Sequence, residues 1–171
     1  MKAPLTIHPS PLAGSGACAT RIIRRGERIC IMAGEEITLL EYARRLNKKV
    51  ERSGDGLQVA AEKYIDLEER YRNINHSCNP NAGIRNKNEL VAIRRICRGE
   101  EITYDYSTTM WENPVRIKEI WPGGLWTMPC RCRAEACRKI IGQFYDLPGS
   151  IQRKYLRLKA VPDFIVRKLG A

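Results

Sequence analysis

The chain has 171 residues, of which 43% are hydrophobic, so it has the size and composition of one globular domain with its own core. Thirty Lys and Arg against nineteen Asp and Glu give a net charge of +11, which favours nucleic acid or acidic partners without indicating any chemistry. No apolar run is long enough for a transmembrane helix, and the first twenty residues lack the apolar segment of a signal peptide. We therefore expect a soluble cytoplasmic protein with no membrane association.

Short strands separated by turn signals predict a mainly β chain with few helices. Prolines and glycines in residues 3–19 predict extended chain and turns, and residues 57–67 predict two short strands. Between them, the apolar periodicity of residues 38–52 predicts a helix that Thr38 can cap. The residues expected on its buried face are Leu39, Leu40, Ala43 and Leu46.

The second half of the chain begins with a predicted strand over residues 102–106, in which Tyr104 and Tyr106 face the same side. Residues 107–129 hold the three tryptophans among prolines and glycines, which predicts an aromatic-rich loop. A basic amphipathic tail follows from residue 148, and we expect it to form a helical element that packs on the domain. The cations that it would present to a partner are Arg153, Lys154, Arg157 and Lys159.

Three of the seven cysteines, Cys130, Cys132 and Cys137, lie within eight residues. Thiolates this close repel each other and oxidise unless a metal binds them, and Zn²⁺ prefers tetrahedral sulfur ligands. Three ligands do not close a structural site, so a fourth is expected from elsewhere, and Cys78 is the natural candidate because it lies in a polar turn. The alternatives are three surface thiols without metal and a redox pair, which the absence of Cys-x-x-Cys disfavours.

Residues 72–81 are crowded with hydrogen-bonding side chains, which alone indicates a turn-rich loop bonded to its own backbone. However, Asn75-His76-Ser77-Cys78-x-Pro80-Asn81 resembles the signature of the SET-domain lysine methyltransferases. Residues 99–106, Gly-Glu-Glu-Ile-Thr-Tyr-Asp-Tyr, resemble the second signature of that family. The cysteine cluster matches its post-SET zinc element, and Gly14-x-Gly16 matches its cofactor loop. These four motifs stand in the family's order over residues 12–142.

The resemblance implies the SET fold, with several small sheets of short strands and the two signature segments threaded through one another as a pseudoknot. It implies a SET domain over residues 1–127 and a zinc-bound post-SET segment over residues 128–147. The basic tail, residues 148–171, lies outside the resemblance. A SET domain without flanking reader modules is typical of a small stand-alone prokaryotic member.

The resemblance also implies transfer of a methyl group from S-adenosylmethionine to a lysine of a protein substrate. The positions that match the family's cofactor-binding residues are Gly14, Gly16, Arg72, Asn75 and His76. Tyr106 matches the catalytic tyrosine, and Tyr104 matches a position whose Phe or Tyr is associated with the number of methyl groups added. A tyrosine there suggests mono- or dimethylation. Cys78 matches the fourth ligand of one structural zinc, beside Cys130, Cys132 and Cys137.

Two positions depart from the family pattern. Met32 stands where many members carry a tyrosine of the lysine channel, and Asn73 stands where an aromatic residue is common. The wall of the channel is therefore expected to differ from the usual one.

Two other functions compete with the methyltransferase: a catalytically inactive SET-like binding module, and a basic, zinc-containing protein associated with nucleic acid. The expected partner of the enzyme is a protein with a target lysine, such as a nucleoid, chromatin or ribosomal protein, and the charge allows nucleic acid nearby. Association with the nucleoid, or secretion as an effector that acts in a host nucleus, are alternative locations.

Overall fold

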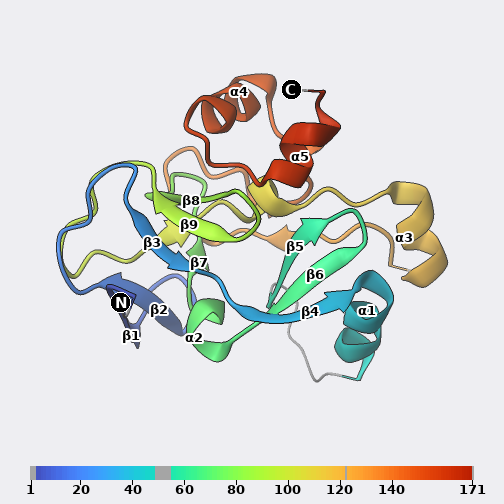
Figure 1. The fold of residues 1–171 in the computed structure, drawn as a ribbon, viewed down its shortest axis with the longest axis horizontal. Coiled ribbons are helices and arrows are strands. Elements are labelled where there is room, and N and C mark those ends of the chain that lie inside the picture. Colours follow the sequence, from blue (N-terminus) through green and yellow to red (C-terminus); the bar gives the residue numbers. More distant parts are fainter. Residues whose placement is uncertain (1–2, 49–54, 122, 171) are drawn as a thin grey trace.

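Short strands pair in five small sheets in the computed structural model, which describes residues 3–48, 55–121 and 123–170 (Figure 1). The strands are β1 (Leu5–Pro9), β2 (Ser15–Ala19), β3 (Arg28–Ile31), β4 (Gly34–Thr38), β5 (Gly56–Ala60), β6 (Lys63–Leu67), β7 (Asn75–His76), β8 (Ala82–Arg85), β9 (Glu89–Ala92), β10 (Thr103–Tyr104), β11 (Met128–Pro129) and β12 (Ile140–Ile141). The helices are α1 (Leu39–Asn47), α2 (Glu69–Arg72), α3 (Pro114–Ile120), α4 (Gly149–Arg157) and α5 (Asp163–Lys168), with 3₁₀ turns at Tyr106–Thr109 and Phe144–Asp146. This architecture confirms the predicted mainly β fold class.

The two largest sheets are antiparallel and have three strands each, in the orders β3-β9-β8 and β4-β6-β5. The other three sheets are the pairs β1-β2, β7-β10 and β11-β12. Residues 3–19, expected as extended chain and turns, thus form the β1-β2 hairpin. Among the described residues, no helix has the length and apolar character that crossing a membrane requires.

The main core lies between the sheets and anchors the two signature segments. Its fully buried members include Ile23, Met32, Leu57, Ile84 and Leu90. Ile74 and Ile102, which precede β7 and β10, pack into the same cluster together with Tyr104. Burial of one such side chain contributes about 1.5–3 kcal/mol, so these contacts fix the backbone on which the candidate site is built.

Helix α1 begins where the sequence predicts, because Thr38 Oγ1 accepts a hydrogen bond from the Glu41 N–H at 3.2 Å. The predicted buried face is wrong at Leu40, which is 64% exposed, and Tyr42 is buried instead. The apolar stripe runs through Leu39, Tyr42, Ala43 and Leu46. This i, i+3, i+4, i+7 spacing leaves Leu40 about 100° away from the stripe. The predicted residues 49–52 lie outside the described part of the chain.

Two further predictions are corrected by local capping. Residues 107–129 are not only a loop, because Asn113 caps helix α3 by accepting hydrogen bonds from two backbone N–H groups, and Pro114 occupies its first position. The strand expected over residues 102–106 ends at Tyr104. Its end is set by Asp105, whose side chain accepts a hydrogen bond from the Ser107 N–H at 3.2 Å and caps the 3₁₀ turn that follows.

The tail forms helices α4 and α5, drawn in red in Figure 1, which lie along one edge of the domain, α4 on the side of β8 and α5 on the side of β5. Tyr155, Phe164 and Ile165 are buried in a second cluster with residues of the domain body. At Gly83 of β8, an added Cβ would lie 2.5 Å from the Cβ of Ala160, so the tail approaches as closely as a glycine permits. The prediction that the tail packs on the domain is confirmed. Its exposed cations include Arg153, Lys154, Arg157 and Lys159.

Candidate functional site

Pairing of β7 with β10 brings the two signature segments side by side. The strands are parallel, with Thr103 opposite Asn75 and Tyr104 opposite His76. The Ser77 N–H extends the pairing by donating to the Tyr104 carbonyl at 3.1 Å. Segments about thirty residues apart in the chain therefore form one wall. The predicted site residues on this wall are Asn75, His76, Tyr104 and Tyr106.

A cavity of about 780 Å³ opens beside this wall. Its volume lies within the range of pockets that hold small molecules, about 300–1,000 Å³. Of the predicted cofactor-binding residues, those in its lining are Gly14, Arg72, Asn75 and His76. Tyr106 also contributes to the lining, and so do residues of the post-SET segment such as Arg131 and Cys132.

Gly16 is buried beside the cavity rather than in its lining, and its role is to make room for Glu101. A Cβ on Gly16 would lie 2.3 Å from a carboxylate oxygen of Glu101. That carboxylate accepts hydrogen bonds from Ser10 Oγ at 2.9 Å and Asn75 Nδ2 at 2.7 Å. Asn75 Nδ2 also donates to the Ser15 carbonyl at 2.8 Å, so its amide ties the β1-β2 loop to the site. Sequence reasoning missed Ser10 and Glu101, although Glu101 stands inside the second signature.

Arg72 lines the cavity, but carboxylates of the protein already bind its guanidinium group. Its nitrogens donate to Asp66, to Asp55 at 3.4 Å and to the Leu67 carbonyl at 2.5 Å. Asp55 and Glu69 also line the cavity, and no sequence motif indicated either of them. Together with Arg72 and Arg131, they give the lining charges of both signs, which suits a ligand with both cationic and anionic groups.

Tyr104 and Tyr106 lie together although Tyr106 is outside the strand. Their ring centroids are 4.8 Å apart, and the Tyr106 ring also contacts the His76 ring at 5.4 Å. The Tyr106 hydroxyl donates to the Ile74 carbonyl at 2.9 Å. Burial raises the pKa of both phenols above the usual value for tyrosine, so both hydroxyls are neutral at physiological pH.

A second, much narrower cavity of about 10 Å³ also has Tyr106 in its lining. Its lining includes Tyr42, Gly56, Tyr104, Tyr106 and Trp126. Tyr106 contributes to the lining of both cavities. Met32, the position that departs from the family pattern, is fully buried in the main core and is not part of this lining.

Asp105 connects the site to the two C-terminal segments. This side chain is 1% exposed and accepts hydrogen bonds from the Arg138 guanidinium at 2.6 Å and the Tyr155 hydroxyl at 3.0 Å. Arg138 lies in the post-SET segment and Tyr155 in helix α4 of the tail. Both segments are therefore attached to the residue that precedes Tyr106. The sequence carries no signal for this contact, because its three members are far apart in the chain.

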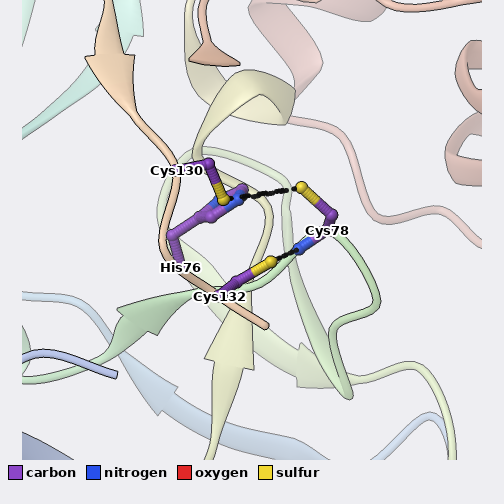
Figure 2. Close-up of side chains that lie close together, drawn as sticks. All are labelled: His76, Cys78, Cys130 and Cys132. Carbon is purple, nitrogen blue, oxygen red and sulfur yellow. Dashed lines mark hydrogen bonds between the residues drawn. The ribbon is translucent and has the colours of Figure 1, made fainter. Parts of the chain in front are cut away.

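Figure 2 shows Cys78, Cys130 and Cys132 converging with His76, and their ligand atoms lie within 4.8 Å of one another. The sulfurs of Cys78 and Cys130 are 3.7 Å apart. Tetrahedral zinc with Zn–S bonds of about 2.3 Å holds sulfurs about 3.8 Å apart, so the spacing fits. The cluster can therefore bind a metal such as zinc.

The pKa of the Cys132 thiol is lowered from the usual value for cysteine. Burial opposes its ionisation, but backbone N–H groups of Cys78 and Ala134 donate to the sulfur and hold its pKa at about 7. The Cys78 N–H is 3.4 Å from this sulfur. A thiolate is the form that ligates metal, so these N–H groups favour binding.

His76 and Cys137 are the two candidates for a fourth ligand. His76 Nδ1 accepts a hydrogen bond from the Tyr106 N–H at 3.2 Å, so the proton of the neutral ring is on Nε2. Burial lowers the pKa of His76 to about 4, which keeps the ring neutral. Nε2 faces Cys78 Sγ at 3.4 Å and donates to it, so it is not free to ligate. Cys137 lies outside the group of four but beside it, with its sulfur 3.9 Å from the Cys130 carbonyl.

A family model described as SET domain matches residues 14–107, more than half of the chain. The chain belongs to the SET-domain family. The match covers both signatures and ends before the cysteine cluster. The predicted resemblance is thus confirmed for the SET domain, while a prokaryotic origin stays a prediction.

Curated relatives of this SET-domain chain are much longer than it is. It is 31% identical to the H3 lysine-36 specific histone-lysine N-methyltransferase of Candida albicans over 93% of the chain and 18% of that protein. It is 30% identical to histone-lysine N-methyltransferase trithorax of Drosophila virilis, and 28% identical to human histone-lysine N-methyltransferase 2B. These matches cover 77% and 79% of the chain but 3% and 5% of the relatives. The chain therefore spans less than a fifth of each relative.

Solved structures agree on the fold. The methyltransferase domain of human histone-lysine N-methyltransferase SETMAR superposes with a TM-score of 0.62 and 21% identity, over 84% of this chain and 59% of that chain. A humanized mutant of the Chaetomium thermophilum Polycomb Repressive Complex 2 bound to the inhibitor GSK126 gives a TM-score of 0.57 and 22% identity, over 64% and 16% of the two chains. The SET fold is thus confirmed by structure as well as by sequence.

Proposed function

We propose that the chain transfers methyl groups from S-adenosylmethionine to a lysine side chain of a protein substrate. The observation that carries the proposal is that Tyr106 lines both a wide and a narrow cavity. We infer that the cofactor occupies the wide cavity and the amine enters the narrow one, so that both contact Tyr106. Relatives named histone-lysine N-methyltransferases support the same reaction class.

The wide cavity suits S-adenosylmethionine in size and charge. We infer that Gly14, Arg72, Asn75 and His76 bind or shape it, while Gly16 acts through its contact with Glu101. The lining carries charges of both signs, from Asp55 and Glu69 and from Arg72 and Arg131, and S-adenosylmethionine likewise carries cationic groups and a carboxylate. When bound, S-adenosylmethionine supplies an electrophilic methyl group on a positively charged sulfur.

The aromatic lining of the narrow cavity suits contact with the apolar stem and neutral amine of lysine, and its rings must move apart for the stem to enter a space of about 10 Å³. A pH of 7 is roughly 3.4 units below the usual pKa of lysine, so loss of the ammonium proton to solvent costs about 4.6 kcal/mol. Burial beside the positive sulfur of the cofactor would lower that cost, because it disfavours the charged ammonium. The Tyr106 hydroxyl donates its hydrogen bond to the Ile74 carbonyl. The lone pairs of its oxygen are therefore available to accept from weak C–H donors such as a polarised methyl group. Alignment of the two reactants at Tyr106 would supply most of the acceleration.

We infer that Cys78, Cys130, Cys132 and Cys137 hold one structural zinc ion. His76 would then lie outside the metal shell and donate to the Cys78 sulfur, an arrangement that stabilises a metal-bound thiolate. The zinc would hold the post-SET segment, proposed as residues 128–147, against the SET domain of residues 1–127. The tail, residues 148–171, would act as a brace through Tyr155 and Asp105.

The substrate is proposed to be a protein of the nucleoid, chromatin or ribosome, and the protein to act in the cytoplasm or on the nucleoid. The decisive test is incubation with S-adenosylmethionine that carries a deuterated methyl group and with protein extract from a strain lacking the gene. Deuterated methyl-lysine, located by mass spectrometry, is the expected result. Cofactor binding without transfer to any protein would instead indicate an inactive binding module, and absence of cofactor binding would contradict the proposal.

Replacing Asn75 with alanine is expected to weaken S-adenosylmethionine binding about 100-fold from the micromolar range. The change removes the amide that ties Glu101 and the Ser15 carbonyl together at the cavity wall. Without these hydrogen bonds the loop is no longer held in position, and a hundredfold weaker affinity corresponds to about 3 kcal/mol for ordering it on binding. Isothermal titration calorimetry measures it, with Asn79→Ala, an exposed amide in the same loop, as the matched control. An unchanged dissociation constant for Asn75→Ala would show that this loop does not shape the cofactor site.

Replacing Tyr104 with phenylalanine is expected to extend the product from mono- or dimethyl-lysine towards trimethyl-lysine. A tyrosine hydroxyl at this narrow cavity can hold a water in the space that an already methylated amine needs. Phenylalanine keeps the ring but cannot anchor that water. The measurement is the mass of a substrate peptide after exhaustive reaction, and rapid trimethylation by the wild-type protein would contradict the idea.

A further inference from the structure

Helix α1 contributes an aromatic ring to the narrow cavity at a place where strand β5 has no side chain. Tyr42 of α1 and Gly56 of β5 line the cavity next to each other. A Cβ on Gly56 would lie 2.6 Å from Cε2 and Cζ of Tyr42 and 2.9 Å from its hydroxyl oxygen. The ring of Tyr42 therefore fills the volume that a side chain at position 56 would occupy.

The Tyr42 ring is held in place from two directions. Its hydroxyl accepts a hydrogen bond from the Gly56 N–H at 3.2 Å. Its face stacks on the Tyr64 ring, with centroids 4.7 Å apart and planes 20° from parallel. Tyr64 is itself fixed by donating to a carboxylate oxygen of Glu112 at 2.9 Å. With 6% of its surface exposed, Tyr42 is an ordered wall and not a mobile surface side chain.

Tyr42 also stands where the narrow cavity meets a second, apolar groove. This groove of about 250 Å³ runs between α1 and α3, and its lining shares Tyr42 and Trp126 with the narrow cavity. Residues on both sides of a target lysine need such an open surface at the mouth of the channel. Because Met32 is buried in the main core, the ring of Tyr42 closes the channel from a different element.

We propose that Tyr42 is a specificity-determining wall of the lysine channel, and that Gly56 is a glycine so that this ring can enter. The inference rests on the function proposed above. The narrow cavity of about 10 Å³ has room for about one water molecule, so the position of each ring decides which amine fits. Tyr42 then determines both how tightly the lysine stem is bound and how much space is left for added methyl groups.

The first test compares Tyr42→Ala with the wild type on a degenerate peptide library that has a fixed central lysine. We expect kcat/KM to fall at least about tenfold, because the stem loses an aromatic wall, and the product to shift towards higher methylation. Binding of n-butylammonium, followed by NMR without cofactor, reports on the channel alone and should weaken at least about threefold. Leu40→Ala, on the exposed face of the same helix, is the matched control and should leave kcat/KM, the degree of methylation and n-butylammonium binding unchanged.

The second test restores an aromatic ring to the narrow cavity from strand β5 instead of helix α1. In the double variant Tyr42→Ala/Gly56→Phe, the new side chain points into the volume that Tyr42 vacates, so kcat/KM and amine binding should recover most of the loss. Where Tyr42→Ala does not fold, Tyr42→Leu keeps the apolar volume without a flat ring and should still shift the product. Unchanged kinetics and product in the folded Tyr42 variants, or a double variant that binds cofactor but recovers nothing, would overturn the inference. A wild type that binds no S-adenosylmethionine and methylates nothing would instead overturn the proposed function.

Discussion

Phenylalanine in place of Tyr106 is expected to lower kcat for methyl transfer about 10²- to 10³-fold while leaving cofactor binding nearly unchanged. The variant keeps the ring that packs 4.8 Å from Tyr104, and so preserves the walls of both cavities. It removes the hydroxyl of Tyr106, a residue in both linings, and this hydroxyl is oriented by its hydrogen bond to the Ile74 carbonyl. Loss of one preorganised polar group at a reacting centre costs about 2.7–4 kcal/mol in kcat.

Single-turnover kinetics at saturating S-adenosylmethionine separate this effect from binding. Tyr145→Phe is the matched control, because its hydroxyl also donates to a backbone carbonyl, that of Glu112 at 3.2 Å, but lies outside both linings. The control should react at the wild-type rate. A Tyr106→Phe variant whose kcat stays within tenfold of the wild type would remove Tyr106 from the chemistry.

The fold class and the two signature segments could be predicted from the sequence because they depend on local features. Turn residues, alternating apolar positions and a capping threonine act over a few residues, and the Thr38 cap is confirmed to the residue. The predicted buried face of α1 was wrong at one residue, because the apolar periodicity fits more than one choice of buried stripe. Leu40 is as apolar as Leu39, and only the contact of Tyr42 with Tyr64 shows which stripe of α1 is buried.

The parts of the candidate site that the sequence did not reveal depend on contacts between distant segments. Asp105, Arg138 and Tyr155 meet although each lies in a different part of the chain. The sequence around Gly56 does not indicate a role in the site. The reason for a glycine there is visible only in the structure, where the Tyr42 ring fills the volume of a side chain at position 56.

Loss of one zinc ligand is expected to have the largest effect on stability. Structural zinc sites in peptides contribute about 10–16 kcal/mol of apparent binding energy, and a serine at Cys132 removes the thiol whose pKa is held at about 7. We expect Cys132→Ser to bind less than one zinc per chain and to unfold at a lower temperature. Because Arg131 and Cys132 also line the wide cavity, S-adenosylmethionine binding should be lost together with the metal.

Elemental analysis of gently purified protein and limited proteolysis of residues 128–147 measure these effects, with exposed Cys97→Ser as the matched control. The same assay distinguishes the two candidates for the fourth ligand. Cys137→Ser should lose zinc, whereas His76→Gln should keep it, because the ring donates its Nε2 proton to Cys78 and does not ligate. Zinc retained by Cys137→Ser and lost by His76→Gln would show that His76, and not Cys137, is the fourth ligand. Zinc absent from the wild-type protein would contradict the metal site altogether.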